Sequence, residues 1–111
     1  MCGITGIWNL DTSTLDLKTL INFNNSLKHR GPDGFGTFVD QKEGLGLGHR
    51  RLSILDISDN GKQPMSYLEE RYWITYNGEI YNFLEIQKEL KKLGHKFFSD
   101  TDTEIILASY V

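Results

Sequence analysis

The chain opens with Met1-Cys2-Gly3-Ile4-Thr5-Gly6-Ile7-Trp8, a cysteine followed at once by a short apolar run. A run of this length and character predicts a buried strand over residues 3–8. Cys2 is the one cysteine among 111 residues, so the chain cannot form an internal disulfide. A single cysteine commonly packs as a small buried hydrophobic residue, and only its place at the second position favours a reactive role here.

Removal of Met1 would make Cys2 the N-terminal residue and would give one residue both a thiol and a free α-amine. An α-amine has an ordinary pKa of about 8, so a usable fraction is free base at neutral pH. An N-terminal nucleophile can therefore be activated by its own amine, without a histidine. A second arrangement stays open, in which His29 or His49 pairs with Cys2 as in a Cys–His hydrolase.

The remaining pattern predicts short strands and amphipathic helices, in a chain whose length indicates one domain or a piece of one. Glycine-punctuated apolar pieces and aromatic or β-branched runs predict the strands, and apolar residues at helical spacing predict the helices. The predicted strands cover 36–40, 44–49, 52–55, 72–77 and 96–98, a loop covers 56–65, and the helices cover 16–28, 82–93 and 101 onward.

Two of these helices begin with the pattern of a capping box. Asn82 is followed by Glu85, and Thr101 is followed by Glu104. Gly94 stands where a helix C-terminal cap belongs. The third helix reaches Val111 without a capping glycine or a terminating proline, so we expect the chain to be a fragment of a longer polypeptide.

Composition and charge narrow the classes of function. The net charge is −3, from 12 basic and 15 acidic residues without a basic run, which argues against nucleic acid as a partner. No apolar run approaches the roughly 18 residues of a transmembrane helix, and the N-terminus lacks signal-peptide features, so we expect no membrane association and a cytoplasmic location. No Cys or His cluster has zinc-site spacing, so we expect no metal site.

Three further groups of residues could carry chemistry. The side chain of Asn77 and the backbone N–H of Gly78 could converge on one oxygen, as an oxyanion hole requires. Arg51 suits the α-carboxylate of a free amino acid through its two-pronged donor set, and Asp102 or Glu79 suits the α-ammonium. Each also has an ordinary explanation, namely an Asn-Gly turn, a surface cation and a carboxylate in the first turn of a helix.

Taken together, these segments form an ordered series of motifs over essentially the whole chain. The series is Cys2-Gly3-Ile4-Thr5-Gly6, Arg30-Gly31-Pro32-Asp33, Gly48-His49-Arg50-Arg51-Leu52-Ser53-Ile54-Leu55-Asp56, Gln63-Pro64-Met65, Asn77-Gly78-Glu79-Ile80-Tyr81-Asn82 and Ser99-Asp100-Thr101-Asp102-Thr103-Glu104. In this order they resemble the glutaminase domain of glutamine-dependent asparagine synthetases, a branch of the class II glutamine amidotransferases.

The resemblance implies an α+β fold, an αββα sandwich of the N-terminal nucleophile hydrolase type that is incomplete in this chain. Residues 1–111 would be the N-terminal part of a type 2 glutamine amidotransferase domain, with the rest of that domain and any synthetase domain absent. Cys2 would be the nucleophile, its α-amine the base, and Asn77 and Gly78 the oxyanion hole. The residues that would bind glutamine are Arg51, Leu52, Ser53, Ile54, Leu55, Asn77, Gly78, Glu79 and Asp102.

The implied reaction is hydrolysis of the glutamine side-chain amide to glutamate and ammonia through a γ-glutamyl thioester on Cys2. The ammonia would supply ATP-dependent asparagine synthesis from aspartate. The implied partners are L-glutamine and a synthetase domain or subunit, and a homodimer is left open. No cofactor is expected in this segment, with ATP and Mg²⁺ acting in the absent synthetase domain. The alternatives are an amidotransferase with another acceptor and a non-catalytic interaction fragment.

Overall fold

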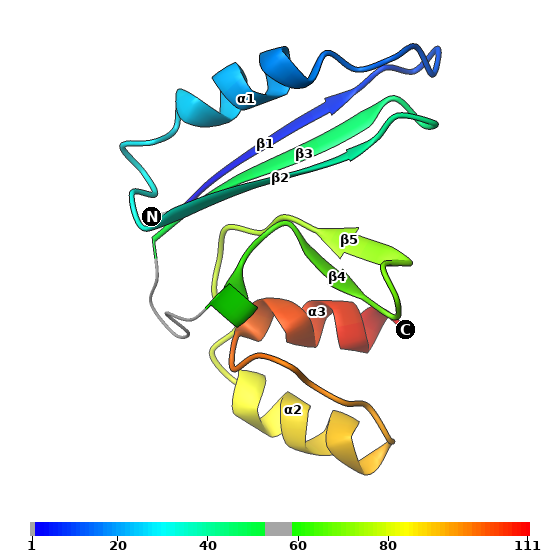
Figure 1. Ribbon diagram of the computed structural model, residues 1–111. Coiled ribbons are helices and arrows are strands. Elements are labelled where there is room, and N and C mark those ends of the chain that lie inside the picture. Colours follow the sequence, from blue (N-terminus) through cyan, green and yellow to red (C-terminus); the bar gives the residue numbers. More distant parts are fainter. Residues whose placement is uncertain (1, 53–58) are drawn as a thin grey trace.

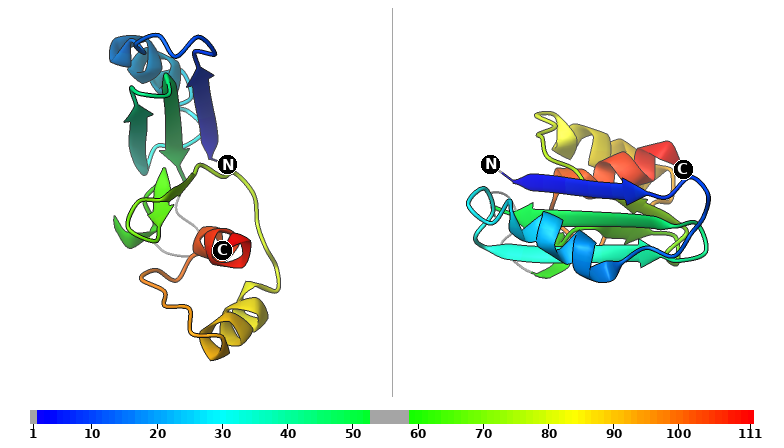
Figure 2. Two further views of the ribbon diagram at one scale, coloured as in Figure 1. Left: turned by 90° about the vertical axis from the view of Figure 1, so that its right-hand side faces the viewer. Right: turned by 90° about the horizontal axis from the view of Figure 1, so that it is seen from above.

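The chain folds into stacked layers of helices and sheets in the computed structural model, which describes residues 2–52 and 59–111. Helix α1 lies on a three-stranded sheet, a two-stranded sheet lies below it, and helices α3 and α2 follow (Figures 1 and 2). The mixed α+β class expected from the sequence is confirmed. The elements are β1 (Gly3–Trp8), α1 (Leu17–Asn25), β2 (Gly34–Asp40), β3 (Leu45–Arg51), a 3-10 turn (Asp59–Gly61), β4 (Met65–Tyr67), β5 (Tyr72–Ile74), α2 (Phe83–Lys92) and α3 (Asp102–Tyr110).

The three-stranded sheet has the order β1-β3-β2 and is antiparallel throughout. The strand predicted at 3–8 is confirmed with its bounds, but the prediction that it is buried was wrong, because Ile4 is 47% and Trp8 is 64% exposed. The strand predicted at 36–40 begins two residues earlier, and the strand predicted at 44–49 is shifted to residues 45–51. Gly3 pairs with Arg50, so the start of β1 lies beside the end of β3. This pairing brings Cys2 close to Arg51 and Leu52, which are about 50 residues away along the chain.

Helix α1 covers this sheet through a narrow apolar strip. Leu20 is fully buried, and a Cβ atom at Gly46 would lie only 2.9 Å from its Cδ2 atom, so the helix packs this closely because β3 carries a glycine there. Leu17 and Ile21, predicted on the buried face, are 46% and 41% exposed. The helix stops at Asn25, earlier than the predicted residue 28, because the chain continues in tight turns closed by bonds from residue i to i−3.

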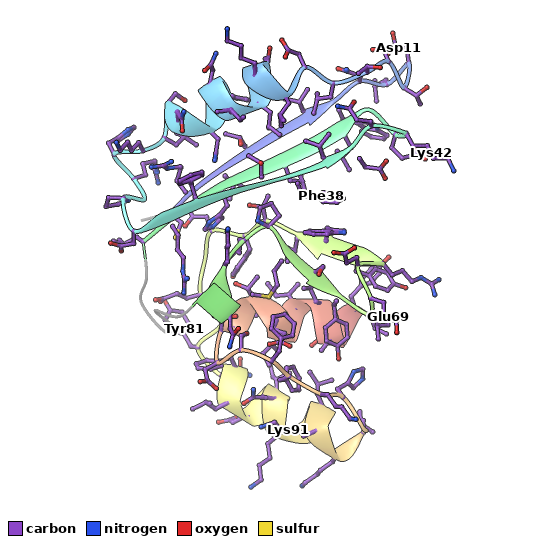
Figure 3. The ribbon with its side chains drawn as sticks, in the orientation of Figure 1. Asp11, Phe38, Lys42, Glu69, Tyr81 and Lys91 are labelled. Carbon is purple, nitrogen blue, oxygen red and sulfur yellow. The ribbon has the colours of Figure 1, made fainter. Side chains whose placement is uncertain are left out.

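The second sheet forms the main apolar core with α3. Met65 and Tyr67 of β4 are buried against Leu107 and Ala108 of α3. The two sheets face each other, and the ring of Phe38 from β2 stacks on Trp73 of β5 with centroids 3.9 Å apart. Phe38 can be found between the sheets in Figure 3.

The local predictions around this second sheet were partly wrong. β4 begins inside the predicted loop 56–65, and β5 ends at Ile74, three residues before its predicted end. The segment 96–98 is not a strand, and residues 53–55 of the strand predicted at 52–55 lie outside the described residues.

Both predicted capping boxes were wrong, although both helices begin where expected. Neither Asn82 nor Thr101 makes a side-chain capping bond. Glu104 instead accepts hydrogen bonds from the backbone N–H groups of Phe98 and Ser99, both at 2.9 Å. The predicted C-terminal cap at Gly94 is confirmed by its φ of +95°, a backbone conformation that favours glycine.

Among the described residues, no helix is long and apolar enough to cross a membrane.

Candidate active site

One cavity collects the predicted site residues from four separate parts of the fold. Cys2 precedes β1, Arg51 ends β3, the segment 77–79 follows β5, and Asp102 begins α3. All of these ends lie on the same side of the molecule, near the N-terminus in Figure 1. The cavity has a volume of about 460 Å³. Its lining residues are Cys2, His49, Arg51, Leu52, Gly61, Gln63, Tyr76, Asn77, Gly78, Glu79, Tyr81, Thr101, Asp102 and Thr103.

Every predicted site residue that the structure describes is therefore at this cavity. Three further predicted residues, Ser53, Ile54 and Leu55, lie outside the described residues. The arrangement brings a thiol, a guanidinium and a buried carboxylate to one space large enough for an amino acid.

The sulfur of Cys2 is half-buried and is held by the backbone that follows β3. The N–H of Leu52 donates to Cys2 Sγ at 3.2 Å, and the thiol lies 3.5 Å from the carbonyl oxygen of the same residue. An N–H aimed at sulfur stabilises the thiolate, because hydrogen bonds to an ionised acceptor are stronger than those to a neutral one. Arg30 Nε donates to the Cys2 carbonyl oxygen at 3.3 Å, which fixes the backbone that carries the thiol.

The charged groups of the cavity are the Arg51 guanidinium and the carboxylates of Asp102 and Glu79, and the two carboxylates differ in exposure. Asp102 is 6% exposed, and its Oδ2 atom accepts the N–H of Ile80 at 2.8 Å. Glu79 is exposed at the same cavity. Burial first, and then the negative charges of Asp102 and Glu79, raise the pKa of the Tyr76 phenol, so both carboxylates act electrostatically on one region of the lining.

Asn77 and Gly78 follow β5 in an irregular segment. The sequence predicts a tight Asn-Gly turn, and the structure has a bend at Gly78, followed by helix α2 as predicted. A Cβ atom at Gly78 would lie 2.5 Å from the Tyr76 hydroxyl oxygen. The segment can pack against that phenol because residue 78 has no side chain.

His49 is buried but forms no pair with Cys2. Its Nε2 atom lies 3.2 Å from the Tyr76 carbonyl oxygen, which can only accept, so Nε2 carries a proton. Among the described residues its Nδ1 atom has no hydrogen-bond partner. Burial lowers the pKa of His49 from its ordinary value of 6.5, the Arg51 charge lowers it further, and the bond to Tyr76 opposes both. His29 is exposed and lies outside the cavity lining, so the described geometry contains no Cys–His pair.

Sequence reasoning missed several lining residues, above all Gln63 and Tyr76. Gln63 belongs to the motif Gln63-Pro64-Met65, but nothing in its local pattern indicates a role in the site. Its contacts are to residues 13 and 40 positions away, which no local pattern can reveal.

Comparisons with known proteins agree on the family that this chain resembles. A family model described as a glutamine amidotransferase domain matches residues 1–111. The chain is 49% identical over 113 residues to the glutamine-hydrolyzing asparagine synthetase 1 of Bacillus subtilis, and 39% identical to asparagine synthetase 3 of the same organism. It is 37% identical to the nodule asparagine synthetase of Pisum sativum. These alignments cover 99 to 100% of the chain, which spans only 17 to 18% of the length of these relatives.

Proposed function

The chain belongs to the glutamine amidotransferase domain family, and we therefore propose that the Cys2 cavity hydrolyses the side-chain amide of L-glutamine to glutamate and ammonia. The observation that carries the proposal is the meeting of Cys2, Arg51 and Asp102 at one cavity. The thiol shares this space with the guanidinium of Arg51 and the buried carboxylate of Asp102, two charges that complement the zwitterionic end of an amino acid.

In the proposed binding mode, the guanidinium of Arg51 holds the α-carboxylate and Asp102 holds the α-ammonium, with help from the exposed Glu79. Arg51 suits this role because its planar fork can donate two parallel hydrogen bonds to a carboxylate. Asp102 suits the ammonium because it is buried and its orientation is fixed by Ile80. The side-chain amide of the substrate then points toward Cys2.

The proposed chemistry has two steps. After loss of Met1, the α-amine of Cys2 takes the thiol proton, and Sγ attacks the amide carbon of the substrate. The resulting oxyanion accepts hydrogen bonds from the Asn77 side chain and the Gly78 N–H, and the loss of one such donor typically costs on the order of 3 kcal/mol in the barrier. The C–N bond then breaks, the α-ammonium returns its proton to the leaving nitrogen, and ammonia departs.

The second step regenerates the enzyme. A γ-glutamyl thioester now joins the substrate carbon to Cys2 Sγ. The α-amine takes a proton from water, whose oxygen attacks the thioester carbon, and the C–S bond breaks to release glutamate. The thiolate recovers its proton, and until then the Leu52 N–H, 3.2 Å from the sulfur, stabilises its charge.

We further propose that the ammonia is used for asparagine synthesis from aspartate, because the similar proteins named above are glutamine-hydrolyzing asparagine synthetases. ATP and Mg²⁺ would then act in a separate synthetase domain and not at the Cys2 cavity. The layer order of helix, sheet, sheet and helix supports an N-terminal nucleophile hydrolase fold, with residues 1–111 as the first part of that domain.

The decisive experiment compares the natural full-length protein with its Cys2→Ala variant. We expect the wild type to release equal amounts of glutamate and ammonia from glutamine, and the variant to release neither while still binding glutamine by calorimetry. His29→Ala serves as the matched control and should keep full activity. Mass spectrometry of the mature N-terminus adds a second check, since retention of Met1 would leave Cys2 without its amine. Unchanged ammonia release by Cys2→Ala would overturn the proposal.

A further inference from the structure

The backbone of Tyr76, directly before Asn77, is held from both sides by buried polar side chains. Gln63 Oε1 accepts the Tyr76 N–H at 2.6 Å, and His49 Nε2–H donates to the Tyr76 carbonyl oxygen at 3.2 Å. Gln63 is 8% exposed and His49 is 1% exposed, so water does not readily replace either contact. Both peptide groups of Tyr76 are thereby fixed, and with them the direction in which the chain enters Asn77 and Gly78.

The other end of the Gln63 amide reaches α3. Its Nε2 atom donates to Thr103 Oγ1 at 3.1 Å, one residue after Asp102. One amide group therefore joins the segment that carries Asn77 to the helix start that carries Asp102. The backbone of Gln63 is itself held against the first sheet. Its backbone carbonyl oxygen packs so closely on Gly36 of β2 that a Cβ atom added to Gly36 would lie 2.2 Å from that oxygen.

We propose that Gln63 is a positioning residue for glutamine hydrolysis. Its two hydrogen bonds hold Asn77 and Gly78 in the correct place relative to Cys2 and to Asp102, the proposed ammonium-binding residue. This inference rests on the function proposed above. The role needs an amide, because the position must accept from a backbone N–H at one end and donate to a hydroxyl at the other. A side chain of equal size without polar atoms would leave the Tyr76 N–H without the acceptor that Gln63 provides.

A misplaced oxyanion hole has a characteristic kinetic effect. The oxyanion exists only in the transition state and the intermediate, so its misplacement lowers kcat while substrate binding is kept. A displacement of about 1 Å can cost about a hundredfold in rate. Alkylation of the Cys2 thiol by iodoacetamide develops no oxyanion, so misplacement of the oxyanion hole should leave the rate of alkylation unchanged. These two readouts separate a positioning role from a general loosening of the fold.

The experiment uses the natural full-length protein with Gln63→Met, which conserves side-chain length and removes both hydrogen bonds. We expect kcat for glutamine to fall about a hundredfold, with KM and the rate of Cys2 alkylation close to the wild type. Thr103→Val, which removes one of the two contacts, should lower kcat less and in the same pattern. Tyr67→Phe is the matched control. It removes from β4 a hydroxyl that bonds to His95 Nδ1 and to the Lys96 carbonyl oxygen, and Tyr67 does not line the cavity. This variant should leave kcat unchanged.

Several outcomes would overturn the inference. Unchanged kcat in both Gln63→Met and Thr103→Val, or equal losses of kcat and alkylation rate, would show that Gln63 has no specific positioning role. A Gln63→Met protein that fails to fold leaves the decision to Thr103→Val alone. Absence of glutamine hydrolysis by the wild type would instead overturn the proposed function itself, so the two failures are distinguishable.

Discussion

Replacement of Asp102 by asparagine should weaken glutamine binding while leaving the fold intact. The Oδ2 atom of Asp102 accepts the Ile80 N–H at 2.8 Å, and an asparagine carbonyl oxygen can accept the same bond. The substitution therefore removes the negative charge of a side chain that is only 6% exposed and preserves its shape. In the proposed binding mode, what is lost is the charge-assisted part of the contact with the α-ammonium of glutamine.

The size of the effect follows from the two kinds of hydrogen bond. A hydrogen bond to a charged group contributes about 1.5–3 kcal/mol and a neutral bond about 0.5–1.5 kcal/mol. The asparagine NH2 group can only donate, so the ammonium must share the carbonyl oxygen with Ile80, and replacement of the charged acceptor by this neutral one costs on the order of 1.4 kcal/mol. This corresponds to about a tenfold rise in KM for glutamine. Glu79 lies at the same cavity but is exposed, so solvent screens it and it cannot replace the lost charge fully.

The assay measures ammonia release from two substrates, glutamine and 4-carbamoylbutanoate, which is glutamine without its α-amine. Asp102→Asn should raise KM for glutamine about tenfold and leave KM for 4-carbamoylbutanoate unchanged. Glu85→Gln is the matched control, because it removes the same charge from an exposed position on α2 outside the cavity lining. Equal changes for the two substrates, or no change for glutamine, would refute the assignment of Asp102 to the ammonium.

Two further changes test the electrostatics and packing of the cavity. A Cβ atom at Gly61 would lie 2.5 Å from Arg51 Nη2 and 2.9 Å from Thr101 Cγ2. Gly61→Ala should therefore displace the guanidinium of Arg51 and raise KM for glutamine with little change in kcat. An unaltered KM would contradict the proposed role of Arg51 in binding the α-carboxylate. The pKa of His49 is lowered in the folded chain, so between that lowered pKa and about pH 6.5 the unfolded chain binds more protons than the folded chain. The stability linked to His49 is therefore present above pH 6.5 and is lost as pH falls toward the lowered pKa. His49→Gln keeps a donor for the Tyr76 carbonyl, and denaturant unfolding should show a shallower fall in the free energy of unfolding on acidification, by about 1.4 kcal/mol for each unit of pKa lowering; an identical pH profile would show that His49 titrates normally.

Much of the local structure could be predicted because it depends on neighbouring residues. The apolar run 3–8 predicted β1 with its observed bounds, and Gly94 predicted the end of α2. The ordered motifs also indicated which residues to group as a site, and those that the structure describes meet at one cavity. The resemblance supplied that grouping, since an isolated cysteine, an Asn-Gly pair or a helix-start carboxylate each has an ordinary explanation.

The predictions that failed share a physical cause. A capping box assumes that a helix-start side chain bonds to its own helix, yet Glu104 bonds to the chain that precedes the helix. Asp102 likewise accepts from Ile80, 22 residues earlier in the chain. β4 has only three residues and is stabilised by its pairing with β5 and its burial on α3, so its own sequence carries little signal.

The class of the elements, most of their positions and the residue types available for chemistry follow from local sequence, because propensity, apolar periodicity and glycine placement act over a few residues. The pairing of distant groups depends on the folded arrangement of the chain. The Leu52 N–H meets the Cys2 sulfur across 50 residues, and the Gln63 amide meets Tyr76 and Thr103 across 13 and 40 residues. Hydrogen bonds act over about 3 Å, so their partners are fixed only when sheet register and helix packing have placed distant segments side by side.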